Sequence, residues 1–406
     1  MLNSRVIKLI ATLFGVLLVS SCRQLVPPVL QSATSAPTSA PTSQPTSQPT
    51  VTSPLEQVSP TPTVQSFTLP GGRLLLAAAA NANSEQMNTA PNFNKYYWLQ
   101  LPDMTITPHS YLAGDYPTRD RRVTISPDLT HLAFGHEIYT QSGDNLYAGG
   151  SLSVLLTDLE GNQTTQIGQT HSADGLSQAL ACGDEISWSA NSQVFAIPLS
   201  SEWNNYYELE HHLYVYDLLS GQFKTVTIQA YSPSSFSLSP DGTQIAFTSF
   251  GDIVGLFLIN VDGSNQRLIA EGWVNSNLVW HPDGKRIFFK SDQPELGIYT
   301  VDISTGVTTL ITSTGDNANC LELSPDFSLL AYDEDGIRVV NADGGQPLVL
   351  TQRANKTLVW SPDSQYIAYI SVYTPKVFVV DTAGRGKVSV YLDDKTDVLE
   401  LIGWLP

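Results

Sequence analysis

Five of the seven histidines of this 406-residue chain have neighbours suited to metal binding or acid–base chemistry. They are His109, His136, His171, His211 and His212. Carboxylates occur near them at Asp115, Asp120, Glu137, Asp144, Asp174, Asp184, Glu185, Glu208 and Glu210. Imidazole and carboxylate groups brought together by folding can ligate a transition metal or move protons in a lyase or hydrolase. No His-x-x-x-His or comparable spacing supports such a site. We therefore expect solvated surface histidines, and we assign no catalytic residue, metal ligand or cofactor.

The segment Glu202-Trp203-Asn204-Asn205-Tyr206-Tyr207 has side chains suited to recognition. Exposed Trp and Tyr rings beside Asn can stack on sugar rings or anchor a protein partner. The alternative is that these rings pack against their own part of the fold. The candidate binding residues are Trp203, Asn204, Tyr206, Tyr207, His211, His212, His136 and His171.

Other kinds of chemistry find no support in the sequence. There is no Gly-x-Ser-x-Gly, His-Glu-x-x-His or phosphate-binding glycine-rich motif, so a serine-peptidase interpretation fails. The net charge of −18 disfavours nucleic acid or an anionic surface as a partner. Cations, cationic peptides and neutral glycans remain open, and we expect a monomer.

A recurrent turn indicates the elements that must position these residues. Each copy precedes an apolar triplet by about three residues, and the copies start at Ser126, Ser189, Ser239, His281, Ser324 and Ser361. Pro presets φ for a turn, Asp or Asn bonds the backbone after it, and Gly tolerates positive φ. The repeat aspartates are therefore expected to hold hairpin turns.

Each turn joins two strands, and a third and fourth strand follow before the next copy. Four antiparallel strands per repeat predict an all-β fold, a β-propeller. Pro70-Gly71-Gly72 and the strand after it resemble a degenerate seventh unit. The C-terminal stretch Leu399–Pro406 resembles a first strand, so we expect seven blades, with the C-terminal strand closing the ring as the innermost strand of the first blade.

Loop length distinguishes the two faces of such a ring. Turns between strands one and two and between strands three and four lie on one face, here named the turn face, and the other connections lie on the loop face. Long loop-face connections are expected at Ala79–Lys95, Thr107–Arg122, Gly135–Ser151, Gly168–Glu185 and Pro198–His212. They belong to the first three blades. Long loops on a rigid scaffold are usual places for recognition.

The Ser-Pro-Asp-Gly turn, the Ile-Ala-Phe strand and the Tyr-Val-Asp strand resemble the TolB-type, WD-repeat-like propellers of bacterial envelopes. The resemblance covers residues 66–406. It implies a propeller but little about function, because such propellers serve as scaffolds, binding modules and enzyme domains. TolB's own partners are not implied, since the chain lacks the additional α/β domain of TolB.

The N-terminus has the pattern of a lipoprotein signal. Arg5 and Lys8 precede an apolar stretch, Leu9–Val19, that is shorter than the about 20 residues needed to span a bilayer. Val19-Ser20-Ser21-Cys22 resembles the bacterial lipobox, which implies that Cys22 is lipidated. We therefore predict a signal peptide at 1–21, a lipidated Cys22 with a Ser/Thr/Pro-rich linker at 22–65, and a propeller at 66–406.

The two remaining cysteines, Cys182 and Cys320, precede turns that are three blades apart. That separation exceeds the reach of a disulfide, so we expect two free, largely buried thiols. Together these features predict a binding or scaffold propeller, lipid-anchored in the bacterial cell envelope and facing outside the cytoplasm, that recognises an envelope protein or a glycan. The expected recognition surface is the loop face. The alternative is a glycan-processing lyase or hydrolase that uses His and carboxylate groups on that face.

Overall fold

The computed structural model describes part of the chain, all of it within the compact unit Thr63–Pro406. The described residues are 69–80, 95–113, 118–138, 140–142, 145–147, 151–171, 186–198, 210–231, 233, 235–272, 274, 277–352, 354–371, 376–390 and 396–406. Cys22 and the linker lie outside them. In the described part of the chain, no helix is long and apolar enough to cross a membrane.

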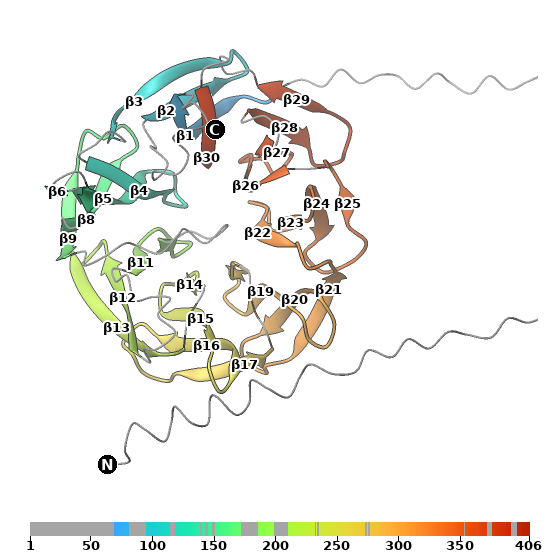
Figure 1. Cartoon of the computed structure of the whole chain (residues 1–406). Coiled ribbons are helices and arrows are strands. Elements are labelled where there is room, and N and C mark those ends of the chain that lie inside the picture. Colours follow the sequence, from blue (N-terminus) through green and yellow to red (C-terminus); the bar gives the residue numbers. More distant parts are fainter. Residues whose placement is uncertain are drawn as a thin grey trace, which may run out of the picture. The chain divides into compact units, whose positions relative to one another are not determined.

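Seven four-stranded antiparallel sheets are arranged as the blades of a ring (Figure 1). Blade 1 contains β1 (Gly72–Ala80), β2 (Lys95–Leu101), β3 (Thr105–Ala113) and β30 (Thr396–Leu405). Blade 2 contains β4 (Thr118–Ile125), β5 (His131–Ile138), β8 (Ser151–Asp158) and β9 (Thr165–His171). Blade 3 contains β10 (Ser187–Trp188), β11 (Val194–Pro198), β12 (Glu210–Asp217) and β13 (Gln222–Gln229). The predicted seven-bladed propeller is confirmed.

The other four blades are regular and follow one another along the chain. Blade 4 contains β14 (Phe236–Leu238), β15 (Gln244–Phe250), β16 (Val254–Asn260) and β17 (Arg267–Glu271). Blade 5 contains β18 (Val279–Trp280), β19 (Arg286–Ser291), β20 (Gly297–Asp302) and β21 (Thr308–Ser313). Blade 6 contains β22 (Asn319–Leu323), β23 (Leu329–Asp333), β24 (Ile337–Asn341) and β25 (Leu348–Val349). Blade 7 contains β26 (Ala354–Trp360), β27 (Tyr366–Ser371), β28 (Val377–Asp381) and β29 (Lys387–Val390).

The hydrophobic core lies between the blades. Each of the seven buried clusters joins residues of two neighbouring blades. In β15, Ile245 and Phe247 pack toward blade 3, whereas Ala246 between them packs toward blade 5. Successive side chains of a strand point to opposite faces, and both faces of a blade are covered. This explains why each repeat carries an uninterrupted apolar triplet.

Side-chain hydrogen bonds fix the recurrent turns. In the five turns that begin with Ser, its hydroxyl donates to the Asp or Asn side chain two residues later at 2.6 Å. The Asp or Asn oxygen that accepts this bond also accepts a backbone N–H. In the turn of blade 4, for example, Asp241 Oδ1 accepts the N–H of Thr243 at 3.0 Å. Burial opposes ionisation of Asp241, but the hydroxyl of Ser239 and the groups of Thr243 outweigh it and lower the pKa. The prediction that the repeat aspartates hold turns is confirmed.

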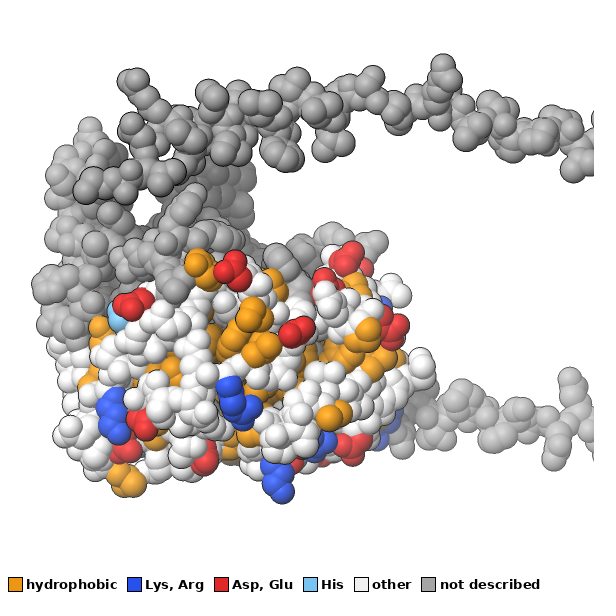
Figure 2. All heavy atoms as spheres, turned by 90° about the horizontal axis from the view of Figure 1, so that it is seen from below, with side chains coloured by type: hydrophobic (Ala, Val, Ile, Leu, Met, Phe, Trp, Pro, Cys, Tyr) orange, Lys and Arg blue, Asp and Glu red, His pale blue; other side chains and the backbone are white. Residues whose placement is uncertain are grey.

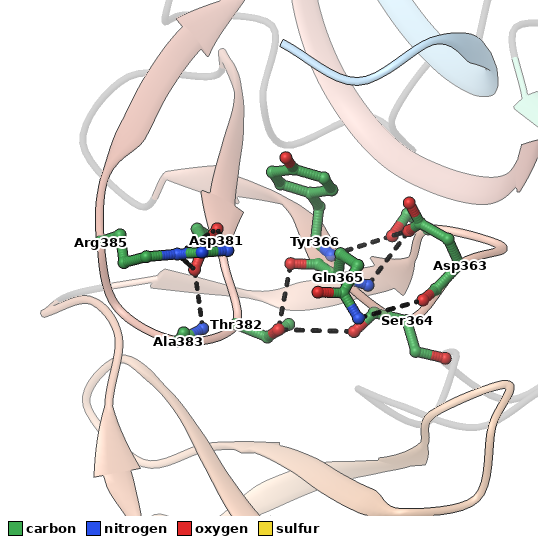
Figure 3. A network of polar contacts seen from close by, with 9 residues as sticks. Asp363, Ser364, Gln365, Tyr366, Asp381, Thr382, Ala383 and Arg385 are labelled. Carbon is green, nitrogen blue, oxygen red and sulfur yellow. Dashed lines mark hydrogen bonds and ion pairs between the residues drawn. The ribbon is translucent and has the colours of Figure 1, made fainter. Parts of the chain in front are cut away.

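Blade 7 shows how two turns of one blade are connected (Figure 3). Asp363 accepts the N–H of Gln365 at 3.1 Å, and the hydroxyl of Thr382 donates to the Gln365 carbonyl at 3.0 Å. Asp381, in the second turn, is 3% exposed and binds the Arg385 guanidinium at 2.6 Å. Burial would raise the pKa of Asp381, but Arg385 and the Ala383 N–H lower it overall.

The C-terminal strand closes the ring. β30 pairs with β1 on the inner side of blade 1, from Arg73–Leu405 to Ala80–Thr396. Trp404 is buried in the cluster between blades 7 and 1, and its Nε1 donates to the Gly71 carbonyl at 3.3 Å. The prediction of closure by the C-terminal strand is confirmed.

Two predicted connections contain more strand than expected. Thr107–Arg122 was expected to be a loop, but β3 continues to Ala113 and β4 begins at Thr118. Pro108 is tolerated because β3 is the outer edge strand of its sheet, where a missing N–H breaks no ladder. Within Gly135–Ser151, β5 continues to Ile138, and a hairpin follows, formed by β6 (Thr140–Ser142) and β7 (Asn145–Tyr147).

The expectation of a free thiol is wrong for Cys320, which is disulfide-bonded and 4% exposed. The other cysteines of the chain, Cys22 and Cys182, lie outside the described residues. The expectation rested on the separation of blades around the ring. Cys320 is in β22, the innermost strand of blade 6, and the strands near the centre of a ring lie closer together than its outer strands (Figure 1).

Candidate functional site

The loop face of blades 1 to 3 carries the longest connections. Residues 81–94 separate β1 from β2, residues 172–186 separate β9 from β10, and residues 199–209 separate β11 from β12. In blade 6, by contrast, only Glu334, Asp335 and Gly336 separate β23 from β24. The predicted concentration of long connections on one face of three adjacent blades therefore holds, except for the segment between β3 and β4.

The aromatic segment belongs to one of these connections. Trp203, Asn204, Tyr206 and Tyr207 lie outside the described residues. They fall between Pro198, the last residue of β11, and Glu210, the first residue of β12. These two strands are paired and lie in the middle of blade 3, so the segment starts and ends on the loop face.

His211 and His212 lie on opposite sides of β12. His211 is 1% exposed and shares its side of the strand with Leu213 and Val215, which pack toward blade 4. His212 is half-buried, and its Nδ1 lies 3.1 Å from the Thr227 hydroxyl. The expectation of a solvated side chain is wrong for His211, because the period-two pattern of the strand continues to this residue.

The remaining histidines of the set belong to blades 1 and 2. His109 is 6% exposed, with Nε2 2.9 Å from the Leu159 carbonyl oxygen, and its Nδ1 accepts the N–H of Leu112, so the surface expectation is wrong for it as well. His136 is half-buried in β5, in register with Ser153. His171 ends β9 and pairs with Ser151. Among the described residues, no group of three or more His, Cys, Asp or Glu could hold a metal ion.

Comparison with known proteins identifies the family. The model of the PD40 TolB β-propeller domain matches residues 185–394, which is more than half of the chain. The chain belongs to the TolB β-propeller family. The search of curated proteins found no significant match.

Several solved structures are similar to this TolB-type propeller. TolB from Acinetobacter baumannii is similar over 82% of this chain and 83% of its own, with 14% identity and a TM-score of 0.43. An oligogalacturonate lyase from Vibrio parahaemolyticus is similar over 71% of this chain and 83% of its own, with 18% identity and a TM-score of 0.51. At 18% identity the likeness to the lyase concerns the fold alone.

This TolB-type propeller also has a buried lysine on the loop face that no sequence motif indicates. Lys290 is 1% exposed at the end of β19, and its Nζ donates to the Asp316 carbonyl at 2.5 Å. Burial lowers its pKa, and the carboxylates of Asp316 and Glu334 oppose that shift. The only signal was a lysine after an apolar triplet, where the other blades have uncharged or acidic residues.

Lys290 holds a short connection in place. Glu334 accepts the N–H of Gly315 and forms an ion pair with Arg338, with Nε and Oε2 2.9 Å apart. The connection between β21 and β22 is therefore fixed from blade 5 by Lys290 and from blade 6 by Glu334. The arrangement positions backbone and gives Lys290 a structural role.

Proposed function

We propose that the protein is a lipid-anchored, extracytoplasmic binding propeller that recognises an envelope protein or a glycan through the loop face of blades 1 to 3. The observation that supports this most strongly is the restriction of long connections to one face of three adjacent blades. The rest of the ring has short turns fixed by hydrogen bonds, which suits a rigid scaffold for those loops.

Two features support the location. The lipobox-like Val19-Ser20-Ser21-Cys22 follows a short apolar segment, and a linker with little capacity to bury a core follows it. The disulfide bond of Cys320 is typical of proteins that fold in oxidising compartments. Both agree with attachment to a membrane through Cys22 and a propeller outside the cytoplasm.

The lyase or hydrolase alternative gains no support from the described histidines. His211 is buried toward blade 4 and His212 lies on the other side of its strand, so the pair cannot act on one substrate. The likeness to oligogalacturonate lyase concerns the fold. We therefore favour binding without catalysis.

A binding screen tests this function. The probes are peptidoglycan fragments, envelope oligosaccharides and envelope-protein domains, and the protein is the chain from Arg23 onward without its lipid. We expect at least one probe to bind the parent and to lose affinity in the triple variant Trp203→Ala, Tyr206→Ala, Tyr207→Ala, with the melting temperature unchanged. Turnover of a glycan by the parent would instead favour the lyase or hydrolase alternative.

A further inference from the structure

One position of the recurrent turn requires positive φ in every copy. It is occupied by Leu129, Ser192, Gly242, Gly284, Phe327 and Ser364, whose φ values lie between 58° and 73°. Glycine adopts this conformation without strain, whereas other residues do not. The serines gain a compensating bond, because Ser364 Oγ accepts the Asp326 N–H of the preceding blade at 3.0 Å, and Ser192 binds Asp128 in the same way at 2.9 Å.

Phe327 has an apolar side chain, so it cannot form the hydrogen bond by which the two serines link neighbouring blades. Its φ is 65°, it is 45% exposed, and it is not among the residues of the buried clusters on either side of blade 6. Its ring lies in a T-shaped arrangement with the His281 ring, with centroids 6.2 Å apart. A residue with strained backbone whose large apolar side chain is nearly half exposed is a feature that folding alone does not favour.

The neighbouring turn of blade 5 also departs from the repeat. His281 replaces the serine of that turn, and its Nδ1 accepts the Asp283 N–H at 3.2 Å. The Asp283 carboxylate lies 3.0 Å from the same nitrogen and 3.6 Å from Arg286 Nε. Arg286 also binds Asp343 of blade 6 at 3.2 Å. An aromatic ring and four charged or ionisable groups therefore form one continuous surface across blades 5 and 6.

Asp343 offers a charge to a partner. Its side chain is 83% exposed, so most of its carboxylate is open to solvent despite the bond to Arg286. Two apolar residues nearby are exposed. Val307, just before β21, is 61% exposed, and Leu348, the first residue of β25, is 45% exposed. Figure 2 shows the molecule from below the view of Figure 1, and the described part of that side carries acidic, basic and hydrophobic side chains mixed together.

We propose that this surface, named here the Phe327 surface (Phe327, His281, Asp283, Arg286 and Asp343), docks a segment of a partner protein. The segment presents an aliphatic or aromatic side chain to Phe327 and a Lys or Arg to Asp343. A basic partner complements a chain with a net charge of −18. The Phe327 surface lies on the turn face, so it is separate from the loop face of blades 1 to 3.

Peptide binding and thermal stability together test this proposal. The probes are fluorescent hexapeptides that combine Phe, Leu or Trp with Lys or Arg, and matched peptides with Glu in place of the basic residues. We expect the parent chain to bind the basic peptides at least about tenfold more tightly than the acidic ones. Phe327→Gly should lower the affinity for the basic peptides by about tenfold or more, because the apolar contact is lost. Its melting temperature should stay equal or rise, because the backbone strain is removed.

Three further variants separate the contributions of Asp343, of backbone strain and of the loop face. Asp343→Asn should lower the affinity for the basic peptides and reduce the salt dependence of their binding, because it removes the carboxylate charge. Leu129→Gly is the matched control, because it relieves the same backbone strain in blade 2 and should leave peptide affinity unchanged. The triple variant Trp203→Ala, Tyr206→Ala, Tyr207→Ala should also leave it unchanged, which separates this proposal from the function of the loop face.

Three outcomes would overturn the proposal. One is equal binding of basic and acidic peptides, or no binding of either, by the parent. Another is a Phe327→Gly variant that melts at a lower temperature and binds as the parent does, which would give Phe327 a structural role. The third is self-association of the parent that Phe327→Gly abolishes, measured by sedimentation, because a second copy would then be the occupant.

Discussion

At the scale of single residues, side chains in the recurrent turns link the blades as well as shape the hairpins. Ser364 is 2% exposed and has a φ of 62°. Ser364→Ala removes its bond to the Asp326 N–H and keeps the strained φ, so it should lower the free energy of unfolding by about 1–2 kcal/mol. Ser364→Gly removes the same bond and relieves the strain, so its loss should be smaller by about 1 kcal/mol. Denaturant unfolding measures both, and equal losses would contradict this role of φ.

Asp302 makes the stability of its turn, between β20 and β21, depend on pH. The Ser304 hydroxyl, followed by the groups of Thr305, lowers the pKa of Asp302 to about 2. A carboxyl group whose pKa is lower in the folded state stabilises the fold above its unfolded pKa, about 3.9, and loses that contribution as the pH falls toward 2. The gap in urea midpoint between the parent and Asp302→Asn should therefore be largest at pH 7 and shrink between pH 4 and pH 3. A gap that stays constant would contradict the assignment.

At the scale of elements, β30 carries the closure of the ring. Trp404 is 5% exposed between blades 7 and 1. Trp404→Ala should lower the free energy of unfolding by about 3–5 kcal/mol, because it leaves a cavity at the closing interface. Leu219→Ala is the control, since Leu219 is 83% exposed and its loss should stay within about 0.5 kcal/mol.

Deletion of Leu399–Pro406 should have a larger effect than either substitution, because it exposes the edge of β1. Light scattering and limited proteolysis would show aggregation or cleavage. A truncated chain that stays monomeric and keeps the parent's melting temperature would contradict closure by β30.

Sequence patterns predicted those elements whose determinants are local. The turns at Ser239 and Ser361 follow from their Pro and Asp, and the apolar triplets follow from burial on both faces of a blade. The extension of β3 to Ala113 was missed because Pro108 signals a loop unless the strand is known to be an edge. The strain at Phe327 could have been read from Gly242 and Gly284, which occupy the same place in the turn.

Properties that depend on the closed ring could not be predicted. The disulfide of Cys320 depends on how distant parts of the chain come together, which leaves no local pattern in the sequence. Burial of His211 depends on which side of β12 faces blade 4. Of the candidate binding residues, the structure describes only the four histidines.

At the scale of the whole molecule, the proposed attachment to a membrane depends on the thiol of Cys22. Cys22→Ser should abolish incorporation of radiolabelled palmitate, because the sulfur atom is the site of acylation in the predicted lipoprotein. The same variant should move from the membrane fraction to the soluble fraction. Equal labelling of variant and parent would contradict the lipoprotein prediction.

Recognition by the loop face of blades 1 to 3 is tested most directly by comparing the affinity of a screened ligand for two variants. One is the triple variant Trp203→Ala, Tyr206→Ala, Tyr207→Ala, and the other is Asp241→Ala on the turn face. We predict that the triple variant binds at least about tenfold more weakly and melts as the parent does, since loop tips carry little of the core. Asp241→Ala should lower the melting temperature and keep the parent's affinity, because it removes only turn hydrogen bonds. Unchanged affinity in the triple variant, with affinity lost in Asp241→Ala, would contradict recognition by the loop face.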